Sequence, residues 1–483
     1  MPQKERSKMR KTKIVCTIGP ASDSRSVLTK LIENGMNVAR LNFSHGTHAE
    51  HQAKIDLIKE IRGELGAPVA IMLDTKGPEI RTGRFSKPEV ELSVGQEFTL
   101  TTEDVEGDET RCSISYRGLP GDVAPGSRIL IDDGLIELEV KSVEGQEIHC
   151  VVNNAGIVKN NKGINIPGAK IHLPSLTEQD IEDIKFGVEN GIDFIAASFI
   201  RKASDVQAIR EVLRSCGGEN IFIISKIENK EGVDNIAEII AASDGIMVAR
   251  GDLGVEIPAE QVPLIQKKII RRCNFEGVPV ITATQMLDSM MRNPRPTRAE
   301  VADVANAILD GTDAIMLSGE SASGKYPVEA LRTMNNIALN TETSLNYESI
   351  LQERVLMKTY NVTNTIGHAT VTSAHGLKAT AILTPTNSGA TAYTVAKFRP
   401  KTPILAFANS PAVARRLALC WGTTPLLMAQ VEHENQIFRE VVAIARGKDY
   451  VQDGDVVIIT AGLPVGGSGK TNMMRIHVVG GPI

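Results

Sequence analysis

Short apolar runs alternate with amphipathic stretches in two parts of the chain. In the first part, strand-like runs at Ile14–Ile18, Asn37–Leu41 and Pro68–Leu73 are separated by helical stretches over about 24–33 and 48–65. After about Pro174 the alternation resumes, with strand-like runs at Phe194–Ser198, Ile221–Ser225, Gly245–Val248, Val278–Ala283 and Ala314–Leu317. Strands that are apolar on both faces and alternate with helices are typical of parallel βα units. Three strands in the first part and five in the second make eight, which favours a TIM (β/α)8 barrel. A doubly wound open sheet is the alternative, because a strand count does not show closure.

Helical periodicity is absent between about Glu79 and Lys170. Short alternating segments such as Glu89–Leu92 and Leu135–Val140 are separated there by Gly, Asp and Pro, which predicts a small all-β module. After a segment at about 342–360 that breaks the pattern, strand-like runs at 379–383, 403–407 and 455–459 alternate with helices. We therefore predict an α/β protein of three domains. They are a barrel from residues 1–78 and 170–344, an inserted small β-barrel from 79–169, and a C-terminal α/β domain from 345–483.

The composition excludes several classes of protein. The chain has 483 residues, and 53 Lys+Arg against 58 Asp+Glu give a net charge of −5. This charge and only 4% aromatic residues suit neither binding to a nucleic-acid backbone nor base stacking. No apolar run approaches the roughly 20 residues that span a bilayer, and no apolar signal-peptide segment follows the basic start. We therefore expect a cytoplasmic protein with no nucleic-acid or membrane partner. The six cysteines are scattered singly, which predicts reduced thiols.

Polar and charged residues lie at the ends of the predicted barrel strands. The set comprises Arg40 and Asn42 at the end of the second strand with Ser44 and His45 close behind, Asp74 and Thr75 at the end of the third, Lys226 and Glu228 at the end of the fifth, Arg250, Gly251 and Asp252 after the sixth, and Thr284 after the seventh. The C-terminal ends of barrel strands open onto one face, and unpaired buried charges are costly. We therefore expect these side chains to gather at one mouth of the barrel.

Two of these carboxylates, Glu228 and Asp252, follow adjacent strands. They suit Mg²⁺, which takes one or two carboxylates and fills its other positions with water and substrate oxygens. The alternative is a pair of salt bridges to Lys226 and Arg250, and the residues alone leave both interpretations open.

A second group of oxygen-bearing residues consists of Asn42, Ser44, Asp74 and Thr75. Their oxygens could hold a monovalent cation. Such residues also cap helices routinely, and the residues alone favour capping.

Positive charge is supplied by Arg40, Arg81, Lys162 and Lys226. Lys, Arg and metal ions are the usual means of stabilising a phosphoryl group during transfer.

The Walker loop pattern is absent from the sequence, and the stretch Gly466–Thr471, which comes near it, is more typical of a flexible hairpin. In the last predicted domain, Thr384–Thr391 follows a strand and opens a helix, which indicates either an anion site or a plain capping turn.

Several long segments resemble the motifs of pyruvate kinases of the bacterial type. In chain order these segments are Asn37–Gly46, Leu73–Arg81, Asn161–Asn165, Ser225–Asn229, Ala249–Glu256, Thr282–Leu287 and Asn293–Glu300. They occur in the order of the family, and the likeness runs from about Lys11 to the end of the chain. The resemblance implies a barrel domain, a β-barrel lid and a C-terminal effector domain, assembled as a homotetramer.

The resemblance also implies roles for individual residues. Glu228 and Asp252 would bind Mg²⁺, and Asn42, Ser44, Asp74 and Thr75 would bind K⁺ rather than cap helices. Glu79 matches the family members that depend on K⁺. The implied catalytic residues are Lys226, Arg40 and Thr284, and the implied substrate contacts are Arg40, Lys226, Gly251, Asp252 and Thr284. The implied nucleotide contacts are Asn42, His45, Arg81 and Lys162, the last of which would come from the lid on closure.

The activity implied by the resemblance is transfer of the phosphoryl group of phosphoenolpyruvate to ADP, giving pyruvate and ATP in the last step of glycolysis. The residues Thr386, Asn387, Ser388, Gly389 and Thr391 match the sugar-phosphate loop of the family. The region before Asp455 carries no Trp or Arg matching those that bind a second phosphate, so we expect a sugar monophosphate or a similar effector. The alternatives are a catalytically silent sugar-phosphate-binding protein and a Mg²⁺-dependent aldolase or lyase.

Overall fold

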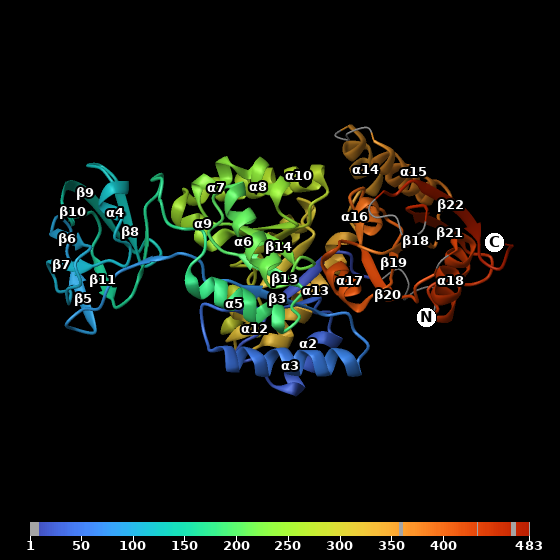
Figure 1. Cartoon of the computed structure of the whole chain (residues 1–483), viewed down its shortest axis with the longest axis horizontal. Helices are drawn as coiled ribbons and strands as arrows, with labels where there is room; N and C mark the ends of the chain where they lie inside the picture. The colour runs from blue at the N-terminus through green and yellow to red at the C-terminus, as the bar shows by residue number, and fades with distance from the viewer. Residues whose placement is uncertain (1–8, 357–360, 432, 465–469, 483) are drawn as a thin grey trace.

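The computed structural model describes residues 9–356, 361–431, 433–464 and 470–482. Figure 1 shows three bodies in a row, with an inserted all-β domain at one end, a barrel in the middle and an α/β domain containing the C-terminus at the other. Most of the stretch Gly466–Thr471 lies outside the described residues. Within the described ranges, no helix has both the length and the apolarity needed to cross a bilayer.

Eight parallel strands close the central barrel in the order β1-β17-β16-β15-β14-β13-β3-β2. Their bounds are β1 Lys13–Thr17, β2 Val38–Asn42, β3 Ala70–Asp74, β13 Phe194–Ala197, β14 Phe222–Ile227, β15 Gly245–Ala249, β16 Val280–Ala283 and β17 Ala314–Leu317. The predicted barrel is therefore confirmed, and the open sheet is excluded. The strands are apolar on both faces because one face packs in the barrel interior and the other packs under the outer helices.

Helices surround the barrel, and several of them begin at a side-chain cap. Their bounds are α2 Arg25–Glu33, α3 His48–Glu64, α5 Glu178–Glu189, α6 Ala203–Ser215, α7 Lys230–Asp234, α8 Ile236–Ala242, α9 Arg250–Glu256, α10 Val262–Glu276, α11 Arg298–Leu309, α12 Gly319–Ala322 and α13 Pro327–Glu342, with short 3₁₀ turns at Ala259–Gln261 and Asp288–Met291. Thr47, Thr177 and Thr297 each form a capping box with the acidic residue three positions later. Each box satisfies backbone N–H groups at its helix N-terminus.

The inserted domain lies between β3 and β13 and is all-β except for one short helix. Its strands are β4 Ile80–Arg81, β5 Glu89–Leu92, β6 Glu97–Thr101, β7 Arg111–Ser113, β8 Arg128–Ile131, β9 Ile136–Glu144, β10 Glu147–Val152, β11 Gly156–Lys159 and β12 Gly163–Asn165, and its helix is α4 Leu119–Asp122. They form a seven-stranded sheet, β4-β12-β8-β9-β10-β6-β7, and a separate pair of β11 with β5. Alternate residues of these strands enter a core of their own.

The C-terminal domain has a five-stranded sheet in the order β20-β19-β18-β21-β22. Its elements are α14 Tyr347–Leu356, α15 Val362–Gly376, β18 Ala381–Thr386, α16 Ala390–Ala396, β19 Ile404–Ala408, α17 Pro411–Arg416, a 3₁₀ turn at Leu417–Leu419, β20 Thr423–Leu427, α18 Glu434–Gly447, β21 Val456–Ala461 and β22 Met473–Val478. The edge strands β20 and β22 are absent from the sequence prediction. The segment that breaks the predicted pattern contains the helix α14.

Candidate active site

Lys226 is at the centre of the polar cluster at the C-terminal mouth of the barrel. It belongs to β14 and is only 9% exposed. Its Nζ lies 2.8 Å from Glu228 Oε1 and 3.1 Å from Asp74 Oδ1, and it donates a 2.7 Å hydrogen bond to Ser198 Oγ. These contacts fix the ammonium group at the mouth and raise its pKa above the usual value, against the lowering effect of burial.

Asp74 connects Lys226 to a second cation. Arg40 Nε, on β2, donates a 2.7 Å hydrogen bond to Asp74 Oδ2, and Arg40 Nη1 donates a 2.9 Å bond to Thr17 Oγ1. Burial alone would raise the pKa of Asp74, but Arg40 and Lys226 hold it below its usual value. Asp74 is therefore an ionised carboxylate that aligns two positive side chains on neighbouring parts of the mouth.

Glu228 and Asp252 lie close enough to affect each other electrostatically. Burial raises the pKa of Glu228 to about 7, with Lys226 opposing the rise and Asp252 adding to it. Burial also raises the pKa of Asp252, and Asp133 of the inserted domain contributes to that rise. Glu228 Oε2 accepts the backbone N–H of Phe199. Both carboxylates line a cleft of about 240 Å³ that also contacts the inserted domain. The chemistry of this pair fits a divalent cation, because Glu228 and Asp252 carry two negative charges, whereas Lys226 supplies one positive charge that it also shares with Asp74.

The alternative in which Arg250 pairs with Asp252 is not what the structure shows. Arg250 Nη1 instead pairs with Asp303 at 2.8 Å, and its Nη2 donates a 2.6 Å hydrogen bond to the carbonyl of Thr284. Thr284 Oγ1 in turn accepts the N–H of Gly251 at 2.8 Å. Of the two predicted salt bridges, the one between Glu228 and Lys226 is present. Arg250 instead holds the backbone of Thr284.

The four residues predicted to bind a monovalent cation also come together. Asn42 pairs with Asp74 across β2 and β3, and Asn42 Oδ1 accepts the N–H of Ser44 at 3.1 Å. Thr75 Oγ1 accepts the N–H of Ser198 at 3.1 Å. The N-cap of the following helix α3 is Thr47, so the capping favoured by the residues alone is not the role of Asn42 or Ser44. Clustered carboxylate, amide and hydroxyl oxygens fit a hard cation.

The predicted nucleotide contacts are divided between the barrel and the inserted domain. His45 is exposed after β2, while Arg81 and Lys162 belong to the inserted domain, where Gly163 pairs with Arg81. Arg81 Nε donates to Glu79 Oε2 at 2.7 Å, and Lys162 Nζ donates to Asp132 Oδ1 at 2.9 Å. The structure therefore places these two cations within the inserted domain rather than on the Lys226 cluster.

The inserted domain is nevertheless attached to the barrel mouth. Asn165 Nδ2, at the end of β12, donates a 3.0 Å hydrogen bond to Glu256 Oε1 on α9. Arg201 donates to the carbonyls of Ile171 and Leu173, which lie on the return segment to the barrel. These contacts hold the base of the inserted domain over the side of the mouth that carries Asp252.

The loop predicted to bind an effector is at the C-terminal end of β18, in another domain. Gly389 N–H donates to Thr386 Oγ1 at 2.9 Å, and Ala390 N–H lies 3.4 Å from Ser388 Oγ. Asn387 Oδ1 accepts from Asn409 Nδ2 at 3.1 Å. Thr391 Oγ1 accepts a 3.1 Å hydrogen bond from Thr471 Oγ1. The predicted effector residues are Thr386, Asn387, Ser388, Gly389 and Thr391. The loop thus has the internal hydrogen bonds expected of a capping turn.

Two residues of the mouth are missing from the sequence prediction. Ser198 accepts from Lys226 and donates a 2.6 Å hydrogen bond to the carbonyl of Thr75, so it joins the Lys226 cluster to the Asp74–Thr75 segment. It directly follows β13, and the rule applied to the other strand ends would have found it. Asp303 could not be found in this way, because it lies on the helix α11 rather than at a strand end.

Comparisons with known proteins agree along the whole chain. A family model described as the pyruvate kinase barrel domain matches residues 9–331, and one described as the pyruvate kinase alpha/beta domain matches residues 364–477. A pyruvate kinase from Sporosarcina psychrophila is 56% identical over 98% of this chain and 81% of its own length. One from Clostridium acetobutylicum is 54% identical over 98% of this chain and all (100%) of its own. The solved structure of a pyruvate kinase from Cryptosporidium parvum has a TM-score of 0.94 at 40% identity, covering 98% of this chain and 97% of that one. The chain belongs to the pyruvate kinase family.

Proposed function

We propose that this chain transfers the phosphoryl group of phosphoenolpyruvate to ADP, giving pyruvate and ATP, as the last step of glycolysis in the cytoplasm. The observation that carries the proposal is the position of the buried Lys226. Its ammonium group contacts Asp74, Glu228 and Ser198, and Glu228 forms the predicted Mg²⁺ site together with Asp252. A fixed ammonium group at the mouth can stabilise a phosphoryl group that carries charge on its oxygens.

Two cations would complete the site. Mg²⁺ held by Glu228 and Asp252 would offset the negative charge of substrate oxygens, which is the role that the fit of these carboxylates supports. K⁺ held by Asn42, Ser44, Asp74 and Thr75 would supply further positive charge near Arg40. Burial and the neighbouring Asp252 raise the pKa of Glu228 although Lys226 lies beside it. This supports the first site, since a bound cation would stabilise the ionised carboxylate.

The residues of the mouth divide into three tasks. Lys226 and Arg40 stabilise the phosphoryl group. The N–H of Gly251 and the hydroxyl of Thr284 position the carboxylate of phosphoenolpyruvate, and Asp252 would hold the cation that offsets the charge of that substrate. The hydrogen bond between Gly251 and Thr284 supports their joint role. After transfer, Lys226 stabilises the enolate, and protonation of that enolate near Thr284 gives pyruvate.

The inserted domain acts as a lid over this mouth. Arg81 and Lys162 would reach the nucleotide from the lid, with Asn42 and His45 on the barrel side. Their position on the inserted domain supports a role on closure, because closure excludes water and strengthens their interaction with phosphates.

An assay linked to pyruvate reduction tests the activity. We expect turnover only with phosphoenolpyruvate, ADP and Mg²⁺ together, and a large fall when Na⁺ replaces K⁺. Release of phosphate or pyruvate without ADP would instead favour the lyase alternative. Failure to turn over under all these conditions would favour the silent binding protein.

We propose further that a sugar monophosphate activates the enzyme through the loop of Thr386, Asn387, Ser388, Gly389 and Thr391. Three hydroxyl groups within this short loop support the idea, since each can donate to a phosphate oxygen. The double variant Ser388→Ala and Thr391→Ala should lose activation by a panel of sugar phosphates and keep the saturated rate. Undiminished activation of the double variant would refute this site.

We also propose a homotetramer built from the domains delimited at residues 1–78 with 170–344, 79–169 and 345–483. An exposed edge supports assembly: β22 ends the five-stranded sheet, and Ile476 and Val478 on it are each 50% exposed. An exposed apolar edge strand is a template for pairing with another chain. Sedimentation equilibrium measures the mass of the assembly, and a monomer at micromolar concentration would refute the proposal.

A further inference from the structure

A cluster of four aromatic rings lies where the segment after β2 meets the helices α3 and α5. Its members are Phe43, His48, His51 and Phe186. The rings of Phe43 and His51 are stacked, with their centres 3.9 Å apart and their planes 8° from parallel. Phe43 is buried and stands in the chain between Asn42 and Ser44, two of the proposed K⁺ ligands. The cluster therefore packs directly against the segment that carries these ligands.

His51 also forms a hydrogen bond with this segment. Its Nε2 lies 2.9 Å from the carbonyl oxygen of His45, and because a carbonyl only accepts, Nε2 carries a proton. Burial lowers the pKa of His51 below its usual value, so the ring is neutral near pH 7 and its Nδ1 has no proton. Among the described residues, this buried Nδ1 has no hydrogen-bond partner. The polar contact that His51 makes is thus the one with His45.

The segment held by His51 is a tight turn. The N–H of His45 donates to the carbonyl of Asn42 at 3.3 Å, and Asn42 Oδ1 accepts the N–H of Ser44 at 3.1 Å. Gly46 follows with a φ of +85°, and a Cβ at this position would lie 3.5 Å from His51 Nε2. The backbone of the turn therefore passes close to the imidazole of His51, which supports it from the side of α3.

The helix α3 has anchors that do not involve His51. His48 Nε2 lies 2.7 Å from Asp183 Oδ1 on α5, which ties the first turn of α3 to its neighbour. Thr47 and Glu50 form the capping box at the helix N-terminus. Loss of the bond from His51 would therefore free the turn and leave the helix in place.

We propose that His51 is a positioning residue of the phosphoryl-transfer site. It fixes the turn so that the oxygens of Asn42 and Ser44 meet K⁺ and the side chain of His45 meets the nucleotide. This inference rests on the proposed function, to which that ion and that nucleotide belong. His51 itself touches neither of them, and the other proposed contacts of phosphoenolpyruvate lie outside the turn. Its loss should therefore weaken the binding of K⁺ and ADP more than it changes the saturated rate.

The variants His51→Leu and His51→Gln test the hydrogen bond. His51→Leu removes the donor and keeps an apolar side chain in the cluster, so the K⁺ concentration for half-maximal rate and the KM for ADP should each rise about tenfold. The kcat at saturating K⁺ and ADP, and the KM for phosphoenolpyruvate, should change by no more than about twofold. His51→Gln keeps an N–H donor near the position of Nε2 and should bring both raised constants back to within about threefold of the parent.

Two measurements report binding without turnover. A cation that binds only the folded protein raises its melting temperature, so the rise caused by K⁺, with Na⁺ at the same concentration as the reference, measures K⁺ binding. This rise should be smaller in His51→Leu than in the parent and should recover in His51→Gln. Calorimetric titration of ADP in the presence of Mg²⁺ and K⁺ should give a Kd about tenfold higher in His51→Leu.

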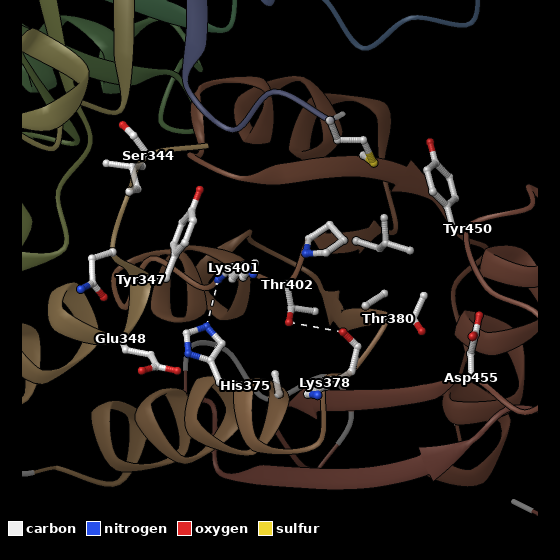
Figure 2. Close-up of a pocket in the computed structure, with 18 of the residues that line it drawn as sticks. Ser344, Tyr347, Glu348, His375, Lys378, Thr380, Lys401, Thr402, Tyr450 and Asp455 are labelled. Carbon is white, nitrogen blue, oxygen red and sulfur yellow. Dashed lines mark hydrogen bonds between the residues drawn. The ribbon is translucent and has the colours of Figure 1, made fainter. Parts of the chain in front are cut away.

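Two further histidine variants are the controls. His48→Leu removes the contact with Asp183 from the same ring cluster. His375→Leu removes a histidine of the C-terminal domain whose Nε2 accepts the backbone N–H of Lys401 at 3.0 Å, in the wall of the cavity drawn in Figure 2. Each loses a hydrogen bond of a histidine ring, as His51→Leu does, but neither ring bonds to the turn. Both should lower the melting temperature and keep the parental constants for K⁺ and ADP.

Four results would overturn the proposal. Parental constants in His51→Leu would show that the turn does not need His51, and equal losses in His48→Leu would assign the effect to packing of the ring cluster. Constants in His51→Gln as poor as those of His51→Leu would show that the hydrogen bond is not the cause. A parent that K⁺ and Na⁺ stabilise equally would show that the turn holds no K⁺ site.

Failure of the proposed function gives a different result. If the parent lacks turnover but its K⁺-dependent melting temperature and its ADP affinity still change with His51 as expected, the reaction is refuted and His51 keeps its positioning role. If the parent turns over and His51→Leu binds K⁺ and ADP as the parent does, the reaction stands and the role of His51 is refuted.

Discussion

Lys226 illustrates how one side chain serves both structure and chemistry. Its ammonium group neutralises Asp74 and Glu228 at the mouth, and it is the cation we expect to contact the phosphoryl group. Lys226→Met should lower kcat by at least about 10³, in line with the loss of one fixed electrostatic partner. It should also reduce the free energy of unfolding by about 3 kcal/mol, because it leaves buried carboxylates without their cation. Steady-state kinetics and denaturant unfolding measure the two effects.

Lys226→Arg is the matched control. It keeps the charge and should recover most of the stability, but its planar fork cannot place a donor at the same point, so kcat should stay low. A near-normal kcat in Lys226→Met would contradict the assigned role whatever its stability.

Glu228 gives the pH dependence of cation binding. Burial raises its pKa to about 7, whereas the same group titrates near 4.5 when unfolded. Between these values the folded protein holds a proton that the unfolded chain lacks, so this group's contribution to stability falls as pH rises through that window.

A cation needs the ionised carboxylate, so Mg²⁺ affinity should fall up to tenfold for each pH unit below about 7 and level off above it. Calorimetric titration of Mg²⁺ in buffers of different ionisation enthalpy measures both the affinity and the released proton.

A flat Mg²⁺ affinity from about pH 5.5 to about 8 would show that Glu228 does not bind the ion, because burial places the pKa of Glu228 at about 7, inside that window. Glu228→Gln is the comparison variant. It should bind Mg²⁺ more weakly and with a shallower dependence on pH.

At the scale of elements, Arg250 connects the start of α9 to the end of β16. Its guanidinium donates to the carbonyl of Thr284 and pairs with Asp303 on α11. Thr284 has a positive φ of +67°, so its backbone needs such support. Arg250→Lys should lower kcat by about tenfold to a hundredfold with a smaller change in KM for phosphoenolpyruvate, because a small displacement of Thr284 affects the reacting geometry.

A second arginine provides the comparison for this prediction. Arg210 on α6 binds the carbonyl of Ala242 and the carboxylate of Asp244, on the outside of the barrel. Arg210→Lys should lower the melting temperature without changing kcat. Equal effects of both substitutions on kcat would mean that Arg250 has only a structural role.

The elements that could be predicted from sequence are those with a strong periodic signal. All eight barrel strands are apolar on both faces, so their alternation with helices favours a barrel, and the structure then shows its closure. In contrast, β20 contains Pro425, and β22 exposes Ile476 and Val478, so neither edge strand has the pattern of a buried strand. The mouth residues follow from their place after strands. The partners of Arg250 and Lys162 do not, because they depend on the three-dimensional packing of loops and helices.

At the scale of the molecule, the C-terminal domain closes the end of the barrel opposite the mouth. Ala418 and Leu419 from the 3₁₀ turn before β20 belong to the core of the barrel interior, and Lys13 Nζ donates to the carbonyl of Thr423. Arg415, at the end of α17, pairs with Asp193 at 2.8 Å. Asp193 Oδ2 in turn accepts the N–H of Ile71, in the strand that ends at Asp74. An ion pair and a hydrogen bond thus join the domain that carries the loop Thr386–Thr391 to a strand that ends at the barrel mouth.

A buried ion pair across this interface joins Arg399 to Asp313 at 2.7 Å. The guanidinium of Arg399 also lies 4.7 Å from the ring centre of Trp421. Arg399→Leu should reduce the free energy of unfolding by about 3 to 5 kcal/mol, since it leaves Asp313 buried without its cation. It should also separate the unfolding of the C-terminal domain, followed by Trp421 fluorescence, from the loss of activity at the barrel mouth.

Arg446→Leu removes the exposed pair with Asp453 and should change the free energy of unfolding by at most about 1 kcal/mol. If fluorescence and activity are lost together in Arg399→Leu at the parental denaturant midpoint, the two domains are held by their apolar contact and this ion pair contributes little.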